Sequence, residues 1–541
     1  MLKINQIIKG TIQMMDENGN AILSHGKDKV IVRHALLHEE VRAKITKASK
    51  NGYIASIVEI QKKHPDRIKP LCPYAGLCGG CQLQHLSYEG QLFWKKQQII
   101  QAVKKHRLPL HVHEVISSDV HAYRNKMIIG FAKNNQGILQ AGLYEEYSHR
   151  IVPYERCMLH PQECDEVIQT ITSLVKKLRI EPYDIKRRKG FLRHVQLRYG
   201  KTSGQILVTF ITAHAQFPAR KTFVQQLIQT HPAIQSIVMN INTRDTSVVL
   251  GSEERILYGE GWIEDRLLNK TFRISSSSFY QINHDQCERL YQKAYDLLQP
   301  KKTDRILDAY CGIGTIGLCL ADQVKEVIGV EVNGQAVKDA ITNAKRNQIR
   351  NARFIKQDAS TFIYQEAKQK QRYDAIILDP PRDGSTPTFL DACAQLNPRK
   401  IIYISCNPLT QLHDLSYLSK KGYICKEMFL YDMFPMSAHV ETVVLLSKLN
   451  TKQHIEVELN LDELDLTAAE SKATYDEIKA YVQEKYGLKV SSLYISQVKR
   501  KCGLDVGQNY NLSKKEDAKV PHCPPEKEAA IMKALKYFRM S

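Results

Sequence analysis

No apolar run in this chain of 541 residues is long enough to span a bilayer. The first residues, Met1-Leu2-Lys3-Ile4-Asn5-Gln6, lack the charged-then-apolar pattern and the cleavage site of a secretory signal. The chain also shows no long internal repeat. We therefore expect no membrane span and no secretory leader, and we predict a cytoplasmic protein.

A disulfide framework is not expected either, although the chain has 13 cysteines. The cytosol keeps thiols reduced, and cysteines in such proteins more often bind metals or act in catalysis. The cysteines are therefore candidates for a metal site or a nucleophile.

Acidic residues are outnumbered. The chain has 77 Lys and Arg residues against 57 Asp and Glu, which gives a formal net charge of +20. This excess favours a polyanionic partner, because each phosphate that Lys or Arg neutralises releases counterions. RNA or DNA is the leading candidate. The length exceeds what one hydrophobic core supports and predicts about three to five domains.

Residues 1–62 are predicted to form a small β-barrel. Turn clusters such as Asp16-Glu17-Asn18-Gly19-Asn20 separate five short strand candidates, which are Gln6–Gln13, Ala21–Leu23, Lys29–Val32, Val41–Ile45 and Tyr53–Glu59. Short strands with interleaved basic residues suit an OB-type barrel that binds nucleic acid. A barrel that only packs against its neighbour is the alternative.

The rest of the chain divides into three further segments. Residues 63–274 mix strand and helix candidates and are predicted to form an α+β domain. Residues 275–449 alternate apolar strands with helices, which predicts a doubly wound, Rossmann-like α/β domain. Residues 450–541 are predicted to form a small helical appendage, with helices at Thr474–Lys485 and Pro525–Phe538. Within it, Thr474–Leu504 is either a small helical nucleic-acid or protein-binding module or a packing appendage.

A glycine-rich turn in the α/β segment predicts a nucleotide-type cofactor site. Glycines between Tyr310 and Gly317 let a ligand approach the backbone where a helix begins. Glu331 ends the next strand candidate, a spacing that dinucleotide sites share. Asp358 and Asp379 follow two further strand candidates. Acidic residues at successive strand ends favour S-adenosylmethionine over a nicotinamide cofactor, because that donor carries an adenine amine, ribose hydroxyls and an ammonium group.

Cys406 follows the apolar run Lys400–Ile404, in Ser405-Cys406-Asn407-Pro408. A thiol at a strand end beside a cofactor site indicates covalent group transfer. Downstream, Glu441 is the candidate base. Taken singly, an inert buried cysteine and a surface carboxylate are the alternatives for these two residues.

Together these motifs resemble the RNA uracil-5-methyltransferase family, in particular its ribosomal RNA branch with an N-terminal TRAM domain. The resemblance covers residues 1 to about 449 and rests on Cys72-x5-Cys78-x2-Cys81 with Cys157, Phe279-Tyr280-Gln281-Ile282-Asn283, the glycine-rich turn, Asp379-Pro380-Pro381-Arg382, Ser405-Cys406-Asn407-Pro408 and His439-Val440-Glu441-Thr442-Val443. It implies a TRAM barrel and a class I methyltransferase domain. It also implies a methyl-donor site formed by Gln281, Tyr310, Thr315, Glu331, Asp358 and Asp379.

The resemblance implies methylation of carbon 5 of a uridine. This carbon is a poor nucleophile, but addition of the Cys406 thiolate to carbon 6 makes the ring an enolate that attacks the methyl group. Glu441 then removes the carbon 5 proton and the thiolate leaves. The target nucleotide must first be extruded from its stack, which is easiest in single-stranded loops.

Cys72, Cys78, Cys81 and Cys157 offer four thiolates, enough for a [4Fe-4S] cluster or a tetrahedral zinc ion. The spacing does not choose between iron and zinc. The family resemblance implies the cluster. We expect a structural or RNA-facing role, because methyl transfer requires no electron.

We therefore predict an S-adenosylmethionine-dependent RNA methyltransferase that makes 5-methyluridine in 23S ribosomal RNA and needs no obligate protein partner. Transfer RNA is the closest alternative substrate, and the TRAM and cysteine motifs argue against it. A non-catalytic iron-sulfur RNA-binding protein is an alternative of another class. Chemically competent residues at each catalytic position argue against that alternative.

Overall fold

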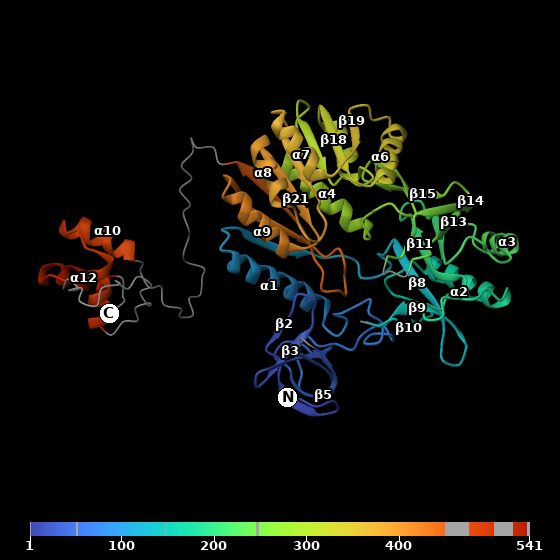
Figure 1. The fold of residues 1–541 in the computed structure, drawn as a ribbon, viewed down its shortest axis with the longest axis horizontal. Helices are drawn as coiled ribbons and strands as arrows, with labels where there is room; N and C mark the ends of the chain where they lie inside the picture. Colours follow the sequence, from blue (N-terminus) through green and yellow to red (C-terminus); the bar gives the residue numbers. More distant parts are fainter. Residues whose placement is uncertain are drawn as a thin grey trace. The chain divides into compact units, whose positions relative to one another are not determined.

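The computed structural model describes residues 2–49, 52–146, 148–244, 248–448, 475–502 and 523–537. The chain forms two compact units, Met1–Asn450 and Thr451–Ser541. Figure 1 labels many of their helices and strands. Within the described ranges, no helix combines the length and the apolar character needed to cross a membrane.

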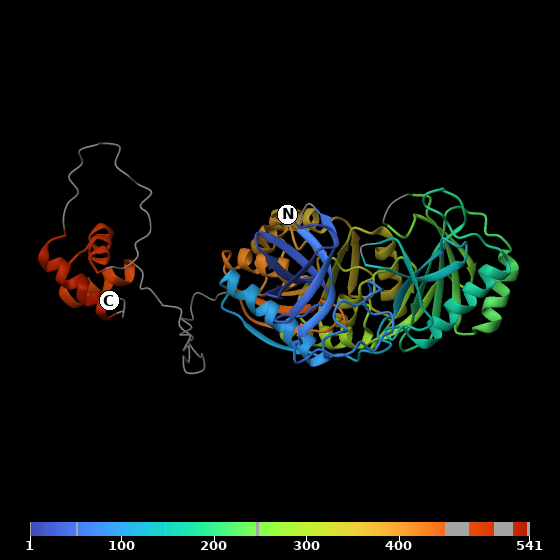
Figure 2. The same cartoon turned by 90° about the horizontal axis from the view of Figure 1, so that it is seen from below.

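The N-terminal residues form a six-stranded sheet in the order β1-β5-β6-β4-β3-β2. Figure 2 shows this part of the chain in blue, beside the N-terminus. Its strands are β1 (Ile7–Thr11), β2 (Met14–Met15), β3 (Ala21–His25), β4 (Asp28–Arg33), β5 (Glu40–Ser49) and β6 (Gly52–Lys62). All five predicted strand positions are occupied by strands. Among the described residues, β1 and β2 at the two ends of this order are not paired with each other, so the predicted barrel is not confirmed.

The largest sheet of the first unit has eight strands in the order β19-β18-β17-β20-β21-β23-β22-β7. Its strands are β7 (His111–Ile116), β17 (Arg305–Ala309), β18 (Glu326–Glu331), β19 (Ala352–Lys356), β20 (Ala375–Leu378), β21 (Lys400–Ser405), β22 (Tyr423–Tyr431) and β23 (Glu441–Lys448). The pairs from β19 to β21 are parallel, whereas β23 is antiparallel to both its neighbours. The predicted α/β fold is confirmed, with a mixed sheet.

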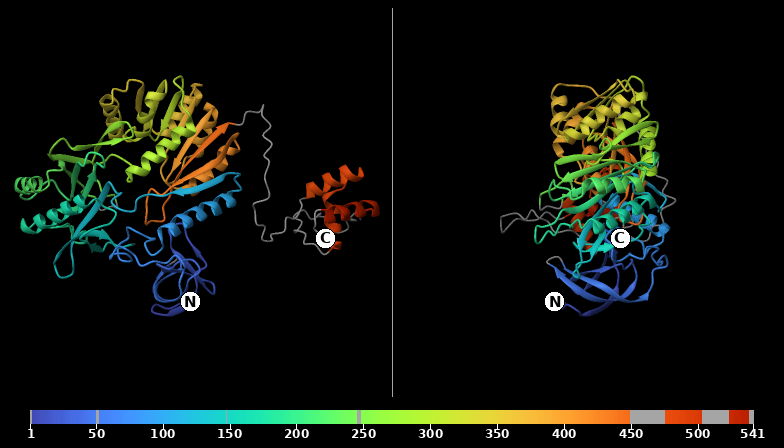
Figure 3. Two further views of the ribbon diagram at one scale, coloured as in Figure 1. Left: turned by 180° about the vertical axis from the view of Figure 1, so that it is seen from behind. Right: turned by 90° about the vertical axis from the view of Figure 1, so that its right-hand side faces the viewer.

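Helices bury both faces of this sheet (Figures 1 and 3). Successive side chains of a strand point to opposite faces, so Ile306 and Leu307 enter different cores. The core around Ile306 includes α4 (His284–Leu298), α5 (Thr315–Leu320) and α6 (Gly334–Arg346). The core around Leu307 includes α1 (Tyr88–His106), α7 (Ala359–Lys368), α8 (Pro387–Leu396) and α9 (Pro408–Ser419). The short 3-10 helix η1 (Ala321–Gln323) follows α5.

The α/β layers also include residues far upstream in the sequence. β7 pairs in parallel with β22, and His111 lies opposite Glu427. Ile99 on α1 and Val112 on β7 pack in the same core as the helices α7 to α9. The boundary predicted at residues 274 and 275 stays a prediction. The structure adds that Tyr88–Ile116 packs with the sheet downstream of that boundary.

The central residues form a seven-stranded sheet in the order β10-β9-β8-β11-β12-β13-β14. Its strands are β8 (Lys126–Lys133), β9 (Leu139–Tyr144), β10 (Ile151–Pro153), β11 (Leu192–Tyr199), β12 (Ile206–Thr212), β13 (Ile234–Ile241) and β14 (Glu253–Tyr258). The helices α2 (Gln162–Lys177) and α3 (Arg220–Thr230) pack on it, and the hairpin β15 (Trp262–Leu267) and β16 (Lys270–Ser275) follows. The central region is thus mixed α and β, as the sequence predicts.

The second unit contains three described helices, α10 (Tyr475–Tyr486), α11 (Ser492–Lys501) and α12 (Pro525–Tyr537). They share one apolar core, formed around Ile478, Ile495 and Ile531. Helices α10 and α12 match the two predicted helices, and α11 was not predicted. Thr474, the first residue of the first predicted helix, and Phe538, the last residue of the second, lie outside the described residues.

Candidate functional site

The candidate site lies at the carboxyl edge of the eight-stranded sheet. Its parallel strands end at one edge, and the chain order reverses between β17 and β20. Ligands of open α/β sheets bind at such a reversal. Tyr310, Glu331, Asp358, Asp379 and Cys406 each end or follow one of these strands. The structure therefore brings the sequence-predicted positions to a common edge.

Asp308 holds the glycine-rich turn in place. Its side chain is buried, and its Oδ2 accepts a hydrogen bond from the Gly317 N–H at 2.9 Å. A Cβ on Gly317 would lie 2.8 Å from the same oxygen, so the position requires glycine. Burial raises the pKa of Asp308 to about 7. Sequence reasoning did not single out Asp308, although a carboxylate inside an apolar strand was a visible signal.

Glu331 and Asp358 are held as hydrogen-bond acceptors at neighbouring strand ends. Glu331 accepts from the backbone N–H groups of Gly312 at 3.2 Å and Asn333 at 2.7 Å. Asp358 caps α7 by accepting from the Thr361 N–H at 2.8 Å. Such carboxylates are suited to accept further bonds from hydroxyl or amine groups of a ligand.

Tyr310 and Thr315 flank the glycine-rich turn. The backbone of Tyr310 is left-handed, with φ of 64°, and its ring centroid lies 5.4 Å from that of Phe389. Thr315 begins α5, and its hydroxyl lies 3.0 Å from that of Tyr291. Packing against Phe389 thus positions Tyr310, and the hydrogen bond with Tyr291 positions Thr315.

Gln281 is buried and contacts the central region. Its backbone carbonyl accepts a hydrogen bond from Asn125 Nδ2 at 2.7 Å. Nearby, Asn283 caps α4 and donates to the backbone carbonyl of Met433 at 3.4 Å. The segment that carries Gln281 therefore lies between the central sheet and the segment that leads to Glu441.

Cys406 and Glu441 lie at the ends of neighbouring strands. In the antiparallel pairing of β21 and β23, Ser405 is opposite Thr442. Cys406 follows Ser405 and Glu441 precedes Thr442, so the same register sets the thiol opposite the carboxyl group. Glu441 is buried, and its Oε2 has no hydrogen-bond partner within the described part of the chain.

The thiol and carboxyl groups of this edge perturb one another. Burial, together with Glu441 and Asp379, raises the pKa of Cys406 to about 12, while Arg382 opposes this shift. Burial and Asp379 raise the pKa of Glu441 well above its ordinary value. Burial raises the pKa of Asp379 to about 7. Strongly shifted groups that gather at one edge are typical of a catalytic centre.

Arg382 connects three of the motif segments. Its carbonyl oxygen accepts hydrogen bonds from Asn407 Nδ2 at 3.0 Å and from the Thr410 hydroxyl at 3.1 Å. Its guanidinium group lies 3.2 Å from Nδ1 of His439. The segment after β20, the start of α9 and the segment before β23 are therefore held together around Cys406.

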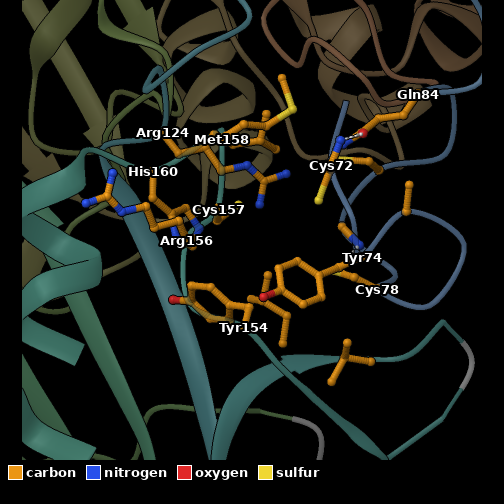
Figure 4. A pocket seen from close by; sticks show the side chains of 16 residues that line it. Cys72, Tyr74, Cys78, Gln84, Arg124, Tyr154, Arg156, Cys157, Met158 and His160 are labelled. Atoms are coloured by element: carbon orange, nitrogen blue, oxygen red, sulfur yellow. Dashed lines mark hydrogen bonds between the residues drawn. The ribbon is translucent and has the colours of Figure 1, made fainter. Parts of the chain in front are cut away.

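The four predicted cysteine ligands line one cavity of the first unit, and Figure 4 shows Cys72 and Cys157 on opposite walls. The others are Cys78 and Cys81, and Arg124 also lines the cavity. Among the described residues, no group of three or more His, Cys, Asp or Glu side chains is arranged to hold a metal ion. The structure thus brings the four thiols to a shared cavity, and the [4Fe-4S] cluster stays a prediction.

Cys157 is positioned by two residues that sequence reasoning missed. Asp165 Oδ2 accepts from the Cys157 N–H at 2.8 Å, and its Oδ1 lies 2.9 Å from His160 Nδ1. His160 also lines the cavity. The close spacing of Cys157 and His160 in the sequence was the available signal.

Known proteins are similar to this chain over most of its length. The profile of the family described as tRNA (uracil-5-)-methyltransferase matches residues 87–449. An uncharacterized RNA methyltransferase of Staphylococcus aureus is 38% identical over 444 residues, which are 82% of this chain and 98% of that protein. One of Listeria innocua is 37% identical over 451 residues, which are 83% of this chain and 99% of that protein.

A solved structure is also similar. The tRNA (uracil-54, C5)-methyltransferase of Pyrococcus abyssi, in complex with S-adenosyl-L-homocysteine, is 26% identical with a TM-score of 0.67. The similarity covers 81% of this chain and 99% of that chain. From the family profile and the relatives, we conclude that this chain belongs to the tRNA (uracil-5-)-methyltransferase family.

Proposed function

We propose that this protein transfers a methyl group from S-adenosylmethionine to carbon 5 of a uridine in RNA. The observation that carries the proposal is the register of β21 and β23, which sets Cys406 opposite Glu441 beside the ligand-binding edge. The solved relative in complex with S-adenosyl-L-homocysteine supports the choice of donor. Glu331, Asp358 and the glycine-rich turn fit that donor, because they combine acceptors with a close backbone approach.

The donor supplies an electrophilic methyl group, and the residues of the chain activate the uracil. The Cys406 sulfur bonds to carbon 6 and its proton passes to a base, for which Asp379 is suited by a pKa of about 7. Carbon 5 then carries the electron pair that bonds to the methyl group, and the bond between this methyl group and the donor sulfur would break, with S-adenosyl-L-homocysteine as the leaving group. Glu441 takes the carbon 5 proton, the bond between sulfur and carbon 6 breaks, and the thiolate is released.

We propose ribosomal RNA as the substrate, because the motifs of this chain resemble the ribosomal RNA branch of the family.

We also propose an OB-type TRAM barrel over residues 1–62. β1 and β2 lie at opposite ends of the strand order but are separated in sequence only by Ile12 and Gln13. Ile12 N–H donates to Glu39 O beside β5, and Gln13 N–H donates to Ile22 O on β3. The two ends of the order therefore meet in one bent segment, as a barrel requires.

Transfer RNA is a second candidate substrate. The observation in its favour is the similarity to the Pyrococcus abyssi protein, which is a tRNA (uracil-54, C5)-methyltransferase. The two substrates are separated by the experiment below.

We also propose that Cys72, Cys78, Cys81 and Cys157 hold a [4Fe-4S] cluster. All four line one cavity. Four cysteine thiolates are the ligand set that a [4Fe-4S] cluster requires.

The test is to incubate the purified protein with labelled methyl donor and either ribosomal or transfer RNA that lacks the modification, then map the labelled base. We expect 5-methyluridine in ribosomal RNA. Label on transfer RNA alone would select the second candidate, and label on cytosine or on a ribose hydroxyl would contradict the mechanism.

The roles of the two catalytic residues are separable with 5-fluorouridine RNA, whose fluorine replaces the proton to be removed. Cys406→Ala should form no covalent adduct, whereas Cys502→Ala, in the second unit, should form it normally. On unmodified RNA, Glu441→Gln should accumulate the adduct. Full turnover by Cys406→Ala would refute the nucleophile assignment.

A further inference from the structure

The second unit contains a helix–turn–helix element downstream of the segment that the family profile matches. Helices α10 and α11 are joined by residues 487–491, which begin with Gly487 in the left-handed region at φ of +66°. Ser491 caps α11 by accepting a hydrogen bond from the Tyr494 N–H at 3.3 Å. A short turn that contains glycine and a capped second helix are features of nucleic-acid-binding helix–turn–helix motifs.

Packing determines which face of α11 is available to a partner. Ile495 and Val498 point into the apolar core shared with α10 and α12. Ser492 and Arg500, which lie on another face of the helix, are exposed. The unit therefore buries one side of α11 and presents a polar side to solvent.

The residues around this polar side are basic and aromatic. A groove at the start of α11 is lined by Lys489, Leu493, Tyr494 and Lys527 among others. Lys527 Nζ lies 5.9 Å from the centroid of the Tyr494 ring. Arg500 extends the positive charge along the helix, and α11 contains no acidic residue. Positive side chains beside an aromatic ring are the usual means of binding a nucleic-acid strand.

The unit lies outside the part of the chain that the family shares. The family profile ends at residue 449, and the Staphylococcus aureus relative is covered to 98% of its length by 82% of this chain. The second unit therefore has no part in the fold that this chain shares with that relative, and its surface needs its own explanation.

We propose that the α11 face, formed by Lys489, Leu493, Tyr494, Arg500 and Lys527, docks the sugar-phosphate backbone of structured RNA without reading its sequence. A helix cannot read bases in the deep, narrow major groove of RNA, so the contacts are to phosphates and riboses. The choice of RNA rests on the proposed function. Docking raises the effective concentration of RNA at the linked catalytic unit, so it lowers KM and leaves kcat unchanged.

The experiment compares two full-length variants of equal net charge. The test variant is Lys489→Gln/Arg500→Gln/Lys527→Gln. The control variant, Lys420→Gln/Lys485→Gln/Lys533→Gln, removes three exposed lysines outside the α11 face. The probe is a fluorescently labelled RNA hairpin with a uridine in its loop, and binding is measured by anisotropy over a range of salt concentrations.

We expect the test variant to bind the hairpin roughly tenfold more weakly, with a salt dependence reduced by about 2 in the logarithmic slope. The control variant should lose less than about twofold. Equal losses in both variants, or no loss in either, would overturn the proposal. Unlabelled duplex DNA that competes as well as the hairpin would overturn the choice of RNA.

Methyl transfer separates this proposal from the proposed function. At saturating RNA, both variants should methylate at the rate of the unaltered protein. If the test variant binds the hairpin as tightly as the unaltered protein and still methylates RNA, the docking surface is wrong and the proposed function stands. If neither the unaltered protein nor either variant methylates RNA, the proposed function itself fails.

Discussion

Lys95 and Asp432 form an ion pair that is fully buried: Lys95 Nζ lies 2.6 Å from Asp432 Oδ1, and neither side chain is exposed to solvent. Lys95 belongs to α1, and Asp432 follows β22 in the segment that leads to Glu441. Lys95 Nζ also lies 3.4 Å from the carbonyl oxygen of Phe434. The amine of α1 therefore anchors the segment that carries the proposed base.

Lys95→Met should destabilise the protein by about 3–5 kcal/mol, because it leaves the Asp432 carboxylate buried without its partner. It should also lower kcat more than it raises KM for RNA, because the Glu441 segment loses its anchor. Denaturant unfolding and steady-state methylation measure the two effects.

Lys96→Met is the matched control, since Lys96 is the next residue of α1 and pairs with the exposed Glu114. It should cost less than about 1 kcal/mol. Equal effects of the two substitutions would contradict the anchoring role of Lys95.

The Cys406 thiol should react slowly in the free protein. With its pKa raised to about 12, its thiolate fraction at pH 8 is far below that of an ordinary thiol. A thiolate of higher pKa is more nucleophilic, which offsets part of the loss of thiolate. Alkylation of Cys406 by iodoacetamide should therefore be roughly thirtyfold slower than that of an ordinary thiol. Mass spectrometry of the Cys406 peptide measures the rate.

Glu441→Gln should speed this alkylation, because it removes a negative neighbour and lowers the pKa of the thiol. Glu427→Gln, which removes an exposed carboxylate paired with His113, should leave the rate unchanged. If Glu441→Gln does not change the alkylation rate, the Glu441 carboxyl group does not raise the pKa of the Cys406 thiol.

Asp379→Asn should abolish methylation. It should also make the folded protein more stable than the unaltered protein, by an amount that grows as pH rises. The folded-state pKa of Asp379 is raised from 3.8 to about 7, so the unfolded chain releases this proton at lower pH than the folded protein. The ionised carboxyl therefore destabilises the fold progressively between about pH 4 and 7. The gain of the Asn variant should grow over this window and level off above it, at up to roughly 4 kcal/mol.

Thermal midpoints measured from pH 4 to 8 test this prediction. The exposed Asp383→Asn is the control and should show no gain that grows with pH. A constant difference between the Asp379 variant and the unaltered protein would refute the pKa shift.

Phe279→Ala should weaken RNA binding by about 1–3 kcal/mol, the usual contribution of one ring stacked on a base. The Phe279 side chain is 67% exposed, although it neighbours the buried Gln281. An apolar ring held at the surface beside the site is suited to stack on RNA. Phe93→Ala, which removes a ring that is 65% exposed on α1, should not change the affinity. Anisotropy with labelled RNA distinguishes the two.

Cys78→Ser should remove the iron-sulfur cluster. Protein prepared without oxygen should be brown and contain iron and sulfide, and the Cys78 variant should lose both. Cys523→Ser, in the second unit, should retain them, because Cys523 lies outside the cavity. A colourless native protein that contains zinc would reverse the assignment.

Much of the local structure was predictable from sequence. The strand positions of the N-terminal sheet and of the α/β segment follow from apolar runs bounded by turn residues, and the structure has strands there. Helix α11 was missed, because its pattern mixes isolated apolar residues with a basic last turn. β7 was missed as a member of the α/β sheet, because its partner β22 lies more than 300 residues downstream, and such pairing has no local signal.

The sequence by itself determined which chemical groups are available and what lies next to each: a glycine-rich turn at a strand end, carboxylates at successive strand ends, and a thiol just beyond an apolar strand. Local backbone preference and hydrophobic periodicity suffice for those features. Tertiary structure alone decided that Cys406 stands opposite Glu441, that four cysteines share a cavity, and that the thiol and carboxyl groups resist ionisation. Distances between remote segments and the loss of water around charged groups arise only when the layers pack together.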